Sequence, residues 1–238
     1  MPKSAQAKSV NRESLQVAPR VGIFSAGAYA RMKAVHFWVY SVVKRILDFL
    51  LAVILLILLM PLMILIAIVI KIDSPGPVLF KQERVGKKGK RFKILKFRSM
   101  VASNDIDDRS CKDEYTRVGG FLRRLSLDEL PQLINVMIGQ MSFVGPRPWV
   151  VEYWTNMNVE ERERSKVLPG ITGLAQVKGR NGISIFQKIQ YDLIYVENYS
   201  FWQDVKVVIL TILTVIKGSD VDAGKEGVWD DIRDLKAR

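Results

Sequence analysis

Two adjacent carboxylates, Asp128 and Glu129, are the side chains of this sequence best placed to do chemistry. Pro131 is tolerated only in the first turn of a helix, so both carboxylates are expected at or near a helix N-terminus, where backbone N–H groups also favour phosphate. Two arginines lie about one turn upstream. Carboxylates in such surroundings can supply a nucleophile and a metal ligand. The structural alternative is a helix start, because Ser126 and Glu129 match a capping box.

Two further segments combine positive charge with an unusual backbone. Pro146 and Pro148 restrict the chain on both sides of Arg147, and a rigidly held arginine suits bidentate contact with phosphate. Residues 168–182 contain four glycines, which allow close backbone approach, but they lack the Gly-Lys-Ser/Thr ending of a P-loop. The polar side chains of this supporting loop include Gln176, Lys178 and Arg180. Each segment alone could be a surface turn, whereas together they indicate a polyphosphate substrate.

The composition narrows the classes of protein to be considered. A net charge of +12 over 238 residues fits a protein lying on an anionic lipid surface, a nucleic-acid binder, or an enzyme for polyphosphate substrates. No motif that reads nucleic acid is present, so nucleic acid is not expected as a partner. The single cysteine, Cys111, and the single histidine, His36, exclude an internal disulfide, a cysteine-based zinc site and a Ser-His-Asp triad.

Residues 49–70 form a run of 22 residues without a charged or polar side chain. About 20 apolar residues are enough to cross a bilayer, but Pro61 in the middle should kink or break the helix. Lys and Arg lie on both sides, four in residues 31–45 and six in residues 71–90, whereas a spanning helix is expected to show a bias toward one end. The run is therefore either a re-entrant hairpin bent at Pro61 or a kinked helix that crosses once.

The remaining chain predicts one β-hairpin and several helices. Residues 78–85 and 91–97 have strand-like patterns around a glycine-containing turn. Helices are predicted from about Tyr115 onward, over 152–166, 188–199 and 204–217. An acidic loop with Asp105, Asp107 and Asp108 fits no calcium-binding pattern and is interpreted as solvated.

A series of motifs in a fixed order resembles the bacterial sugar transferases that are monotopic phosphoglycosyl transferases. The motifs are Lys44 to Asp48, the apolar run with its central proline, Lys96 to Met100, Ser126 to Leu133, Gly145 to Pro148 and Pro169 to Gly173. The resemblance covers Val43 to about Lys217. One residue departs from the family pattern, since Met60 precedes Pro61 where the family often has serine.

The resemblance implies a reaction in which a UDP-sugar donates its sugar-1-phosphate to polyprenyl (undecaprenyl) phosphate, giving polyprenyl diphosphate-sugar and UMP. Asp128 matches the nucleophile that forms a covalent phosphosugar intermediate, and Glu129 matches the ligand of Mg²⁺. Lys96, Arg123 and Arg147 match basic substrate contacts. The reaction would be the first membrane step in assembling a bacterial exopolysaccharide, capsule, O-antigen or glycoprotein glycan. The alternative is a non-enzymatic scaffold whose basic face binds anionic lipid.

The resemblance also favours the hairpin, with the catalytic domain on the cytoplasmic face of the bacterial inner membrane. The expected fold is mainly α with a small β-hairpin, and a homodimer is left open. The expected organisation is a disordered tail (1–20), an interfacial helix (21–48), a re-entrant hairpin (49–70), a compact catalytic domain (71–217) and a mobile C-terminal tail (218–238).

Overall fold

The computed structural model describes residues 26–101, 115–179, 183–216 and 228–237. The predicted disordered tail over 1–20, the acidic loop with Asp105, Asp107 and Asp108, and Arg180 lie outside these residues. The chain divides into two units, Met1–His36 and Phe37–Arg238. Of the first unit, only the helical residues from Ala26 onward are described. The functional residues discussed below all belong to the second.

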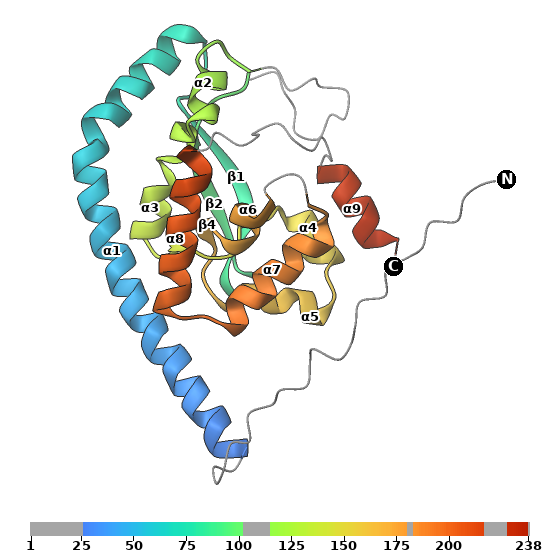
Figure 1. Cartoon of the computed structure of the whole chain (residues 1–238). Coiled ribbons are helices and arrows are strands. Elements are labelled where there is room, and N and C mark those ends of the chain that lie inside the picture. Colours follow the sequence, from blue (N-terminus) through green and yellow to red (C-terminus); the bar gives the residue numbers. More distant parts are fainter. Residues whose placement is uncertain (1–25, 102–114, 180–182, 217–227, 238) are drawn as a thin grey trace, which may run out of the picture. The chain divides into compact units, whose positions relative to one another are not determined.

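One long helix, α1 (Ala26–Asp73), contains Pro61 in its interior. The expected interfacial helix and membrane hairpin are thus parts of a single helix, which bends without breaking (Figure 1). A proline removes one backbone donor and crowds the preceding turn, so a bent but continuous helix is a common outcome. Within the described part of the chain, α1 is the one helix long and apolar enough to cross a membrane. Its middle exposes large side chains such as Ile57 and Leu58.

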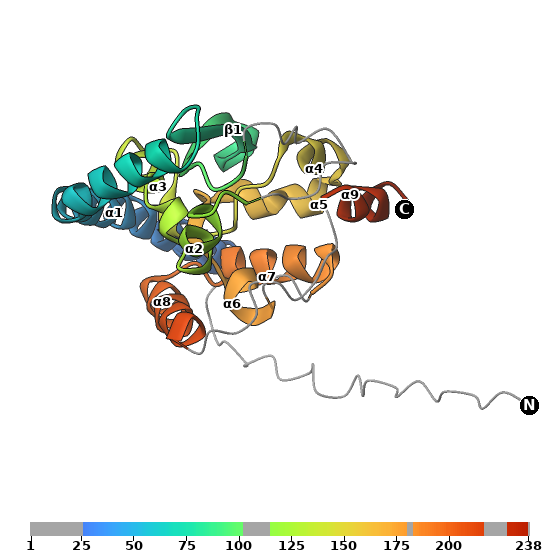
Figure 2. The same ribbon diagram turned by 90° about the horizontal axis from the view of Figure 1, so that it is seen from above.

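The other elements are short, apart from two helices near the C-terminal side. They are β1 (Leu79–Val85), η2 (Lys87–Gly89), β2 (Arg91–Phe97), α2 (Gly119–Arg124), η3 (Leu127–Glu129), α3 (Gln132–Met137), β3 (Ser142–Val144), α4 (Val151–Asn156), α5 (Val159–Arg162), η4 (Glu163–Lys166), β4 (Gly170–Thr172), α6 (Leu174–Gly179), α7 (Ile185–Glu197), α8 (Phe201–Ile216) and α9 (Val228–Lys236). The prediction of a mainly helical chain with a small β-hairpin is confirmed, whereas the break expected in the apolar run is absent from α1. Figures 1 and 2 show α8 beside α1, and α4 and α9 on the other side of the domain.

Helix α1 packs against the rest of the domain on both sides of its proline. Before it, Arg45 donates hydrogen bonds to the last carbonyls of α3, and Asp48 accepts one from the backbone N–H of Phe143. After it, Ile66 and Ile70 are buried in a cluster that includes residues of β2 and α2. The two arms of the bent helix therefore contact the same folded unit.

The predicted β-hairpin is confirmed, with β1 and β2 pairing antiparallel. The register places Phe80 opposite Lys96 and Arg84 opposite Phe92. Because directly opposed residues share a face and faces alternate along a strand, Arg84 and Lys96 lie on the same face of the hairpin. That face also carries Phe92 and Ile94, which are buried against α3.

A second pair of strands was not predicted. β3 and β4 are three residues each and pair in parallel, which is too short for alternation in the sequence to reveal. Gly145, just after β3, and Gly170, the first residue of β4, lie in close contact. A Cβ on Gly170 would lie 2.1 Å from the backbone nitrogen of Gly145, so a larger residue would not fit there. This contact fixes the start of the loop that carries Arg147.

The single charged helix predicted over 152–166 is three short helices, α4, α5 and η4. The backbone is extended at Met157 and Asn158, and Asn158 starts α5 with a capping box to Glu161. The asparagine side chain offers the backbone an alternative to continuing the first helix, which explains the interruption.

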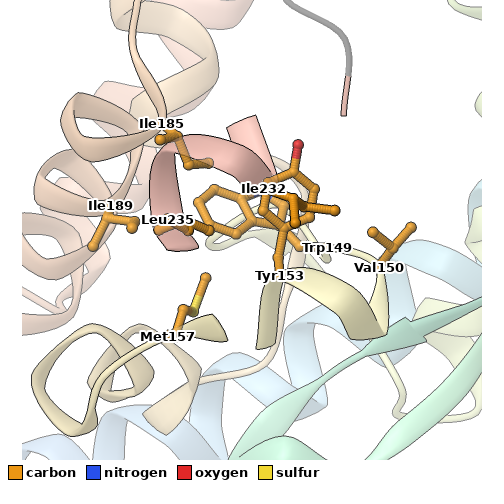
Figure 3. Close-up of a cluster of buried hydrophobic side chains, with 8 residues drawn as sticks. All are labelled: Trp149, Val150, Tyr153, Met157, Ile185, Ile189, Ile232 and Leu235. Carbon is orange, nitrogen blue, oxygen red and sulfur yellow. The ribbon is translucent and has the colours of Figure 1, made fainter. Parts of the chain in front are cut away.

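The C-terminal segment also differs from the prediction, because part of the expected mobile tail forms α9. Ile232 and Leu235 of this helix are buried against Trp149 and Tyr153 and the start of α7 (Figure 3). The hydroxyl of Tyr153 donates a 2.8 Å hydrogen bond to Asp231 of the same helix. The short segment has few apolar residues, and their burial depends on partners some 80 residues away, which local composition does not reveal.

Candidate active site

Three separate segments bring charged side chains together at Glu129. Its Oε1 atom accepts a 2.7 Å hydrogen bond from Lys96 Nζ, at the end of β2, and a 3.1 Å hydrogen bond from Arg147 Nη2, in the loop after β3. Lys96 and Glu129 are largely buried, whereas Arg147 is exposed. The structure therefore assembles three of the residues that the sequence singled out.

Asp128 lies beside this group and is only 6% exposed. The short η3 turn that carries it follows Ser126, whose φ of 57° lies in the left-handed region that non-glycine residues seldom adopt. Ser126 makes no side-chain cap, and the carboxylate of Glu129 is directed to the two cations. The capping-box alternative is therefore wrong. Backbone strain of this kind is characteristic of functional sites.

The two carboxyl groups have opposite electrostatic properties. Burial raises the pKa of Asp128 above its usual value, and the nearby charge of Lys96 opposes that change. Burial would also raise the pKa of Glu129, but the charges of Arg147 and Lys96 outweigh it and lower this pKa to about 2. The two cations therefore hold Glu129 strongly as an anion, whereas burial makes Asp128 harder to ionise than a carboxyl group in water.

The loop around Arg147 holds its backbone firmly. Pro146 and Pro148 are buried while Arg147 between them is exposed, as expected of a rigidly presented side chain. Its carbonyl accepts a 2.7 Å hydrogen bond from Arg164 Nη2. Arg164 also pairs with the buried carboxylate of Asp192 at 2.6 Å and stacks 3.9 Å from the ring of Trp149.

The other predicted site residues are placed less centrally. The charge of Arg123 acts on Asp128, but its guanidinium group is exposed and donates to the hydroxyl of Tyr115 at 3.1 Å. Gln176 donates a 3.0 Å hydrogen bond to the carbonyl of Ile171 and thereby supports β4. Lys178 is exposed on α6, and no contact places it in the site among the residues described.

Three residues near the site were not predicted, namely Arg84, Gln132 and Arg164. Arg84 could have been found from the hairpin alone, because a strand of this register puts it on the face of Lys96. Gln132 follows Asp128 by four residues, but the turn and Pro131 between them prevent a helical spacing from placing the two side chains together. Arg164 is 17 residues from Arg147, and no local pattern joins them.

The donor set near Asp128 fits Mg²⁺. No group of three or more metal-ligating side chains occurs within the described ranges, but Mg²⁺ commonly takes only one or two carboxylates together with substrate phosphates. Both hydrogen bonds to Glu129 reach Oε1, so its Oε2 atom has no partner in the part of the chain that the structure describes. This oxygen and the neighbouring Asp128 are the protein atoms available to such an ion.

Comparisons with known proteins show the family to which this chain belongs. The family of bacterial sugar transferases matches residues 39–218. The uncharacterized sugar transferase EpsL of Bacillus subtilis is 40% identical over 177 residues, which are 74% of this chain and 88% of that protein. The UDP-glucose:undecaprenyl-phosphate glucose-1-phosphate transferase of Escherichia coli is 44% identical over 73% of this chain. The UDP-N-acetylgalactosamine-undecaprenyl-phosphate N-acetylgalactosaminephosphotransferase of Aeromonas hydrophila is 42% identical over 76%.

This chain belongs to the bacterial sugar transferase family, and it is an enzyme of the sugar-phosphate transferase type. That assignment decides against the non-enzymatic scaffold. The matched region makes up only 40% of the E. coli relative and 45% of the A. hydrophila relative. The helix α9 begins beyond residue 218, where the family match ends.

Proposed function

We propose that this enzyme transfers a sugar-1-phosphate from a UDP-sugar to undecaprenyl phosphate, giving undecaprenyl diphosphate-sugar and UMP. The names of its E. coli and A. hydrophila relatives state this acceptor, with glucose and N-acetylgalactosamine as the respective sugars. The observation that carries the proposal is the buried carboxylate of Asp128 beside Glu129, Lys96 and Arg147. A carboxylate with cations around it can attack phosphorus, because the cations stabilise charge on the phosphoryl oxygens.

In the first half-reaction, an oxygen of Asp128 forms a bond to the phosphorus that bears the sugar. The bond from that phosphorus to the bridging oxygen breaks, and its electron pair leaves with UMP. Lys96 and Arg147 are placed to neutralise the phosphate oxygens during this exchange. The buried position of Asp128 keeps water away from the resulting acyl phosphate, which limits its hydrolysis.

In the second half-reaction, an oxygen of undecaprenyl phosphate forms a bond to the same phosphorus, and the electron pair returns to the Asp128 carboxylate. The attacking group is already an anion, so no general base is required. The only histidine, His36, is therefore not needed as a base. Mg²⁺, held by Glu129 and the diphosphate, would supply further charge neutralisation.

The packing of α1 supports a re-entrant position in the membrane. Its arms contact one folded domain before and after Pro61, through Arg45 and Asp48 on one side and Ile66 and Ile70 on the other. A helix that crossed the bilayer once would have to separate these contacts by the hydrocarbon core. We therefore propose that the bend dips into one leaflet and that the domain rests on the cytoplasmic surface, where the phosphate of the acceptor lies.

The activity is tested with the purified chain, Mg²⁺, undecaprenyl phosphate and a panel of UDP-sugars, following UMP release. Asp128→Asn should abolish release, while Asp234→Asn, an exposed aspartate on α9, should leave it unchanged. With UDP-sugar and no acceptor, the peptide containing Asp128 should gain the mass of a sugar phosphate. Activity of Asp128→Asn comparable with the wild type would refute the nucleophile assignment.

The membrane position is tested with single cysteines at the two ends of α1 in a Cys111→Ser background. Met32 and Ile72 are 67% and 81% exposed. Met32→Cys and Ile72→Cys should both react with an impermeant maleimide in inverted vesicles, and neither should react in spheroplasts. Labelling from opposite sides would show that the helix crosses the bilayer.

A further inference from the structure

A small cavity adjoins the cluster around Glu129. It shares Lys96 and Arg147 with the cluster around Glu129, and it is also lined by Arg84, Gln132 and Pro148. The cavity lies between the hairpin, the first turn of α3 and the loop that carries Arg147. Its lining is therefore contributed by the same segments that assemble the catalytic group.

The residues that the structure describes leave two hydrogen-bond donors in this lining unpaired. Nε of Arg84 and Nε2 of Gln132 are buried and have no hydrogen-bond partner among the residues described. Gln132 is only 2% exposed. Buried donors are seldom left unpaired in native proteins, so an acceptor from outside the protein is expected to complete these two.

The protein itself fixes the orientation of Arg84. Its Nη2 atom donates to the side-chain oxygen of Gln82, and Nη1 lies 3.4 Å from the carbonyl oxygen of Pro148. These contacts occupy the two terminal nitrogens and leave Nε without a partner in the part of the chain described. A guanidinium group held in this way is prepared to receive an acceptor without further ordering.

The charges around the cavity specify an anion. Arg84, Lys96 and Arg147 are three cations, and among them Glu129 is the carboxylate that pairs with both Lys96 and Arg147. Burial, followed by the charge of Arg147, lowers the pKa of Arg84 to about 10. An added anion would relieve this repulsion and accept hydrogen bonds from both unpaired donors.

The cavity and Asp128 mark two different parts of the site. Arg84, Lys96 and Arg147 line the cavity, whereas Asp128 and Arg123 do not. The phosphorus attacked by Asp128 therefore lies outside the cavity, and the phosphate that departs is placed inside it, at Arg84. Resting on the function proposed above, we propose that Arg84 and Gln132 form a phosphomonoester site that receives UMP as it leaves and then undecaprenyl phosphate as it attacks.

The chemistry requires both phosphates to use one position. In an in-line displacement the departing oxygen lies opposite the Asp128 oxygen. In the second half-reaction Asp128 departs, so the attacking oxygen must lie opposite it again. Both occupants of that position are phosphate monoesters, which present several acceptor oxygens and two negative charges to Arg84 and Gln132.

The affinity for UMP tests this site with the full-length chain in nanodiscs, measured by calorimetry. Arg84→Met and Arg84→Lys should weaken UMP binding by about tenfold or more, because a charged hydrogen bond is lost. Gln132→Glu should weaken it by a similar factor, since a nearly isosteric carboxylate repels phosphate while retaining contact with the cations. Arg91→Met is the matched control, because Arg91 lies on the other face of the hairpin with 60% of its side chain exposed.

The KM for undecaprenyl phosphate tests the shared use of the site. It should rise in Arg84→Lys and Gln132→Glu in parallel with the dissociation constant of UMP, and Arg91→Met should change neither. Turnover by the wild type together with unchanged UMP affinity in both variants would overturn this inference and leave the proposed function intact. A weaker affinity for UMP with an unchanged KM for the acceptor would refute the shared site. No turnover and no UMP binding by the wild type would overturn both proposals.

Discussion

Two clusters of side chains, each built around a largely buried carboxylate, differ in how completely their groups are paired. In the first, which we call the anchor cluster (Tyr40, Lys44, Tyr195 and Asp204), one carboxylate is saturated. Oδ2 of Asp204 accepts hydrogen bonds from Lys44 and from the hydroxyl of Tyr40 at 2.6 Å, and Oδ1 accepts one from Tyr195 at 2.6 Å. This cluster joins α1 to α7 and α8 and leaves no charge in excess.

The second, which we call the phosphate cluster, consists of Arg84, Lys96, Glu129, Gln132 and Arg147. Here one oxygen of Glu129 is shared by two cations, and two donors have no partner in the described residues. A cluster whose groups are all paired can stabilise the packing of the elements that carry them. A cluster with unpaired donors and cations can in addition bind an anionic ligand. The difference predicts that substitutions in the anchor cluster will reduce stability, and substitutions in the phosphate cluster will reduce activity.

Glu129→Gln should give the largest effect on the phosphate side of this comparison. The substitution removes the negative charge paired with Lys96 and Arg147 and the oxygen available to Mg²⁺. We expect UMP release to fall by about 10²–10³-fold, a typical effect of losing one electrostatic contact at a reacting phosphate or carbonyl. The unfolding free energy should fall by only about 1–2 kcal/mol, less than in the anchor cluster. Glu83→Gln, at an exposed hairpin position, is the control, and a strongly destabilised but active Glu129→Gln enzyme would reverse the comparison.

Asp204→Asn should give the largest effect on the anchor side. Lys44 would be left buried without its counter-charge, and breaking such a pair typically costs about 3–5 kcal/mol of unfolding free energy. Denaturant unfolding in micelles measures this loss. The double variant Lys44→Met with Asp204→Asn should recover part of it, because the unpaired charge is then absent. If the single variant keeps its stability but loses UMP release, the cluster is not an anchor.

Some of this organisation is readable from the sequence. The hairpin is predictable because a glycine-containing turn separates two strand-like runs, and Arg147 is predictable as a rigid arginine because prolines flank it. Asp128 and Glu129 stand out as adjacent carboxylates near arginines. The grouping of Lys96 with Glu129, 33 residues apart, came only from the family resemblance, since nothing local relates them.

The remainder depends on tertiary contacts. The strands β3 and β4 are too short to show alternation. Their parallel pairing is accompanied by a close contact between Gly145 and Gly170, which are 25 residues apart in the sequence. Ile232 and Leu235 on α9 are isolated apolar residues until they meet Trp149 and Tyr153 (Figure 3). Gln132 becomes informative only when its amide is seen to lack a partner in the described part of the chain.

Arg164 is expected to contribute both to stability, as in the anchor cluster, and to activity, as in the phosphate cluster. Its carboxylate partner, Asp192, is buried as in the anchor cluster, yet its other contact is the backbone of Arg147. Arg164→Lys keeps the charge but loses the planar fork. We expect a loss of about 2 kcal/mol in stability and about tenfold in kcat/KM for the UDP-sugar, measured on the folded enzyme at a temperature where both forms are fully folded.

The matched control for this prediction is Arg162→Lys, since Arg162 stacks on Trp154 in the same helical region without touching Arg147. This variant should retain both its stability and its kcat/KM for the UDP-sugar. A loss of stability in Arg164→Lys with full activity would show that the residue only supports packing and does not position Arg147.

The pH dependence of stability should give the smallest effect. The folded-state pKa of Glu129 is about 2, below its ordinary value of 4.5, so its ionised form stabilises the fold at pH values above about 4.5. This contribution is lost as the pH falls from about 4.5 toward 2, when protonation removes the partner of Lys96 and Arg147. We expect about 1–2 kcal/mol of this loss to be specific to Glu129. Denaturant unfolding of the wild type and Glu129→Gln at pH 6 and pH 3 measures it, because the variant lacks the titrating group and should lose less stability. Equal losses in the two proteins would show that Lys96 and Arg147 do not lower the pKa of Glu129. The positive potential of the phosphate cluster would then be weaker than the distances between these groups imply.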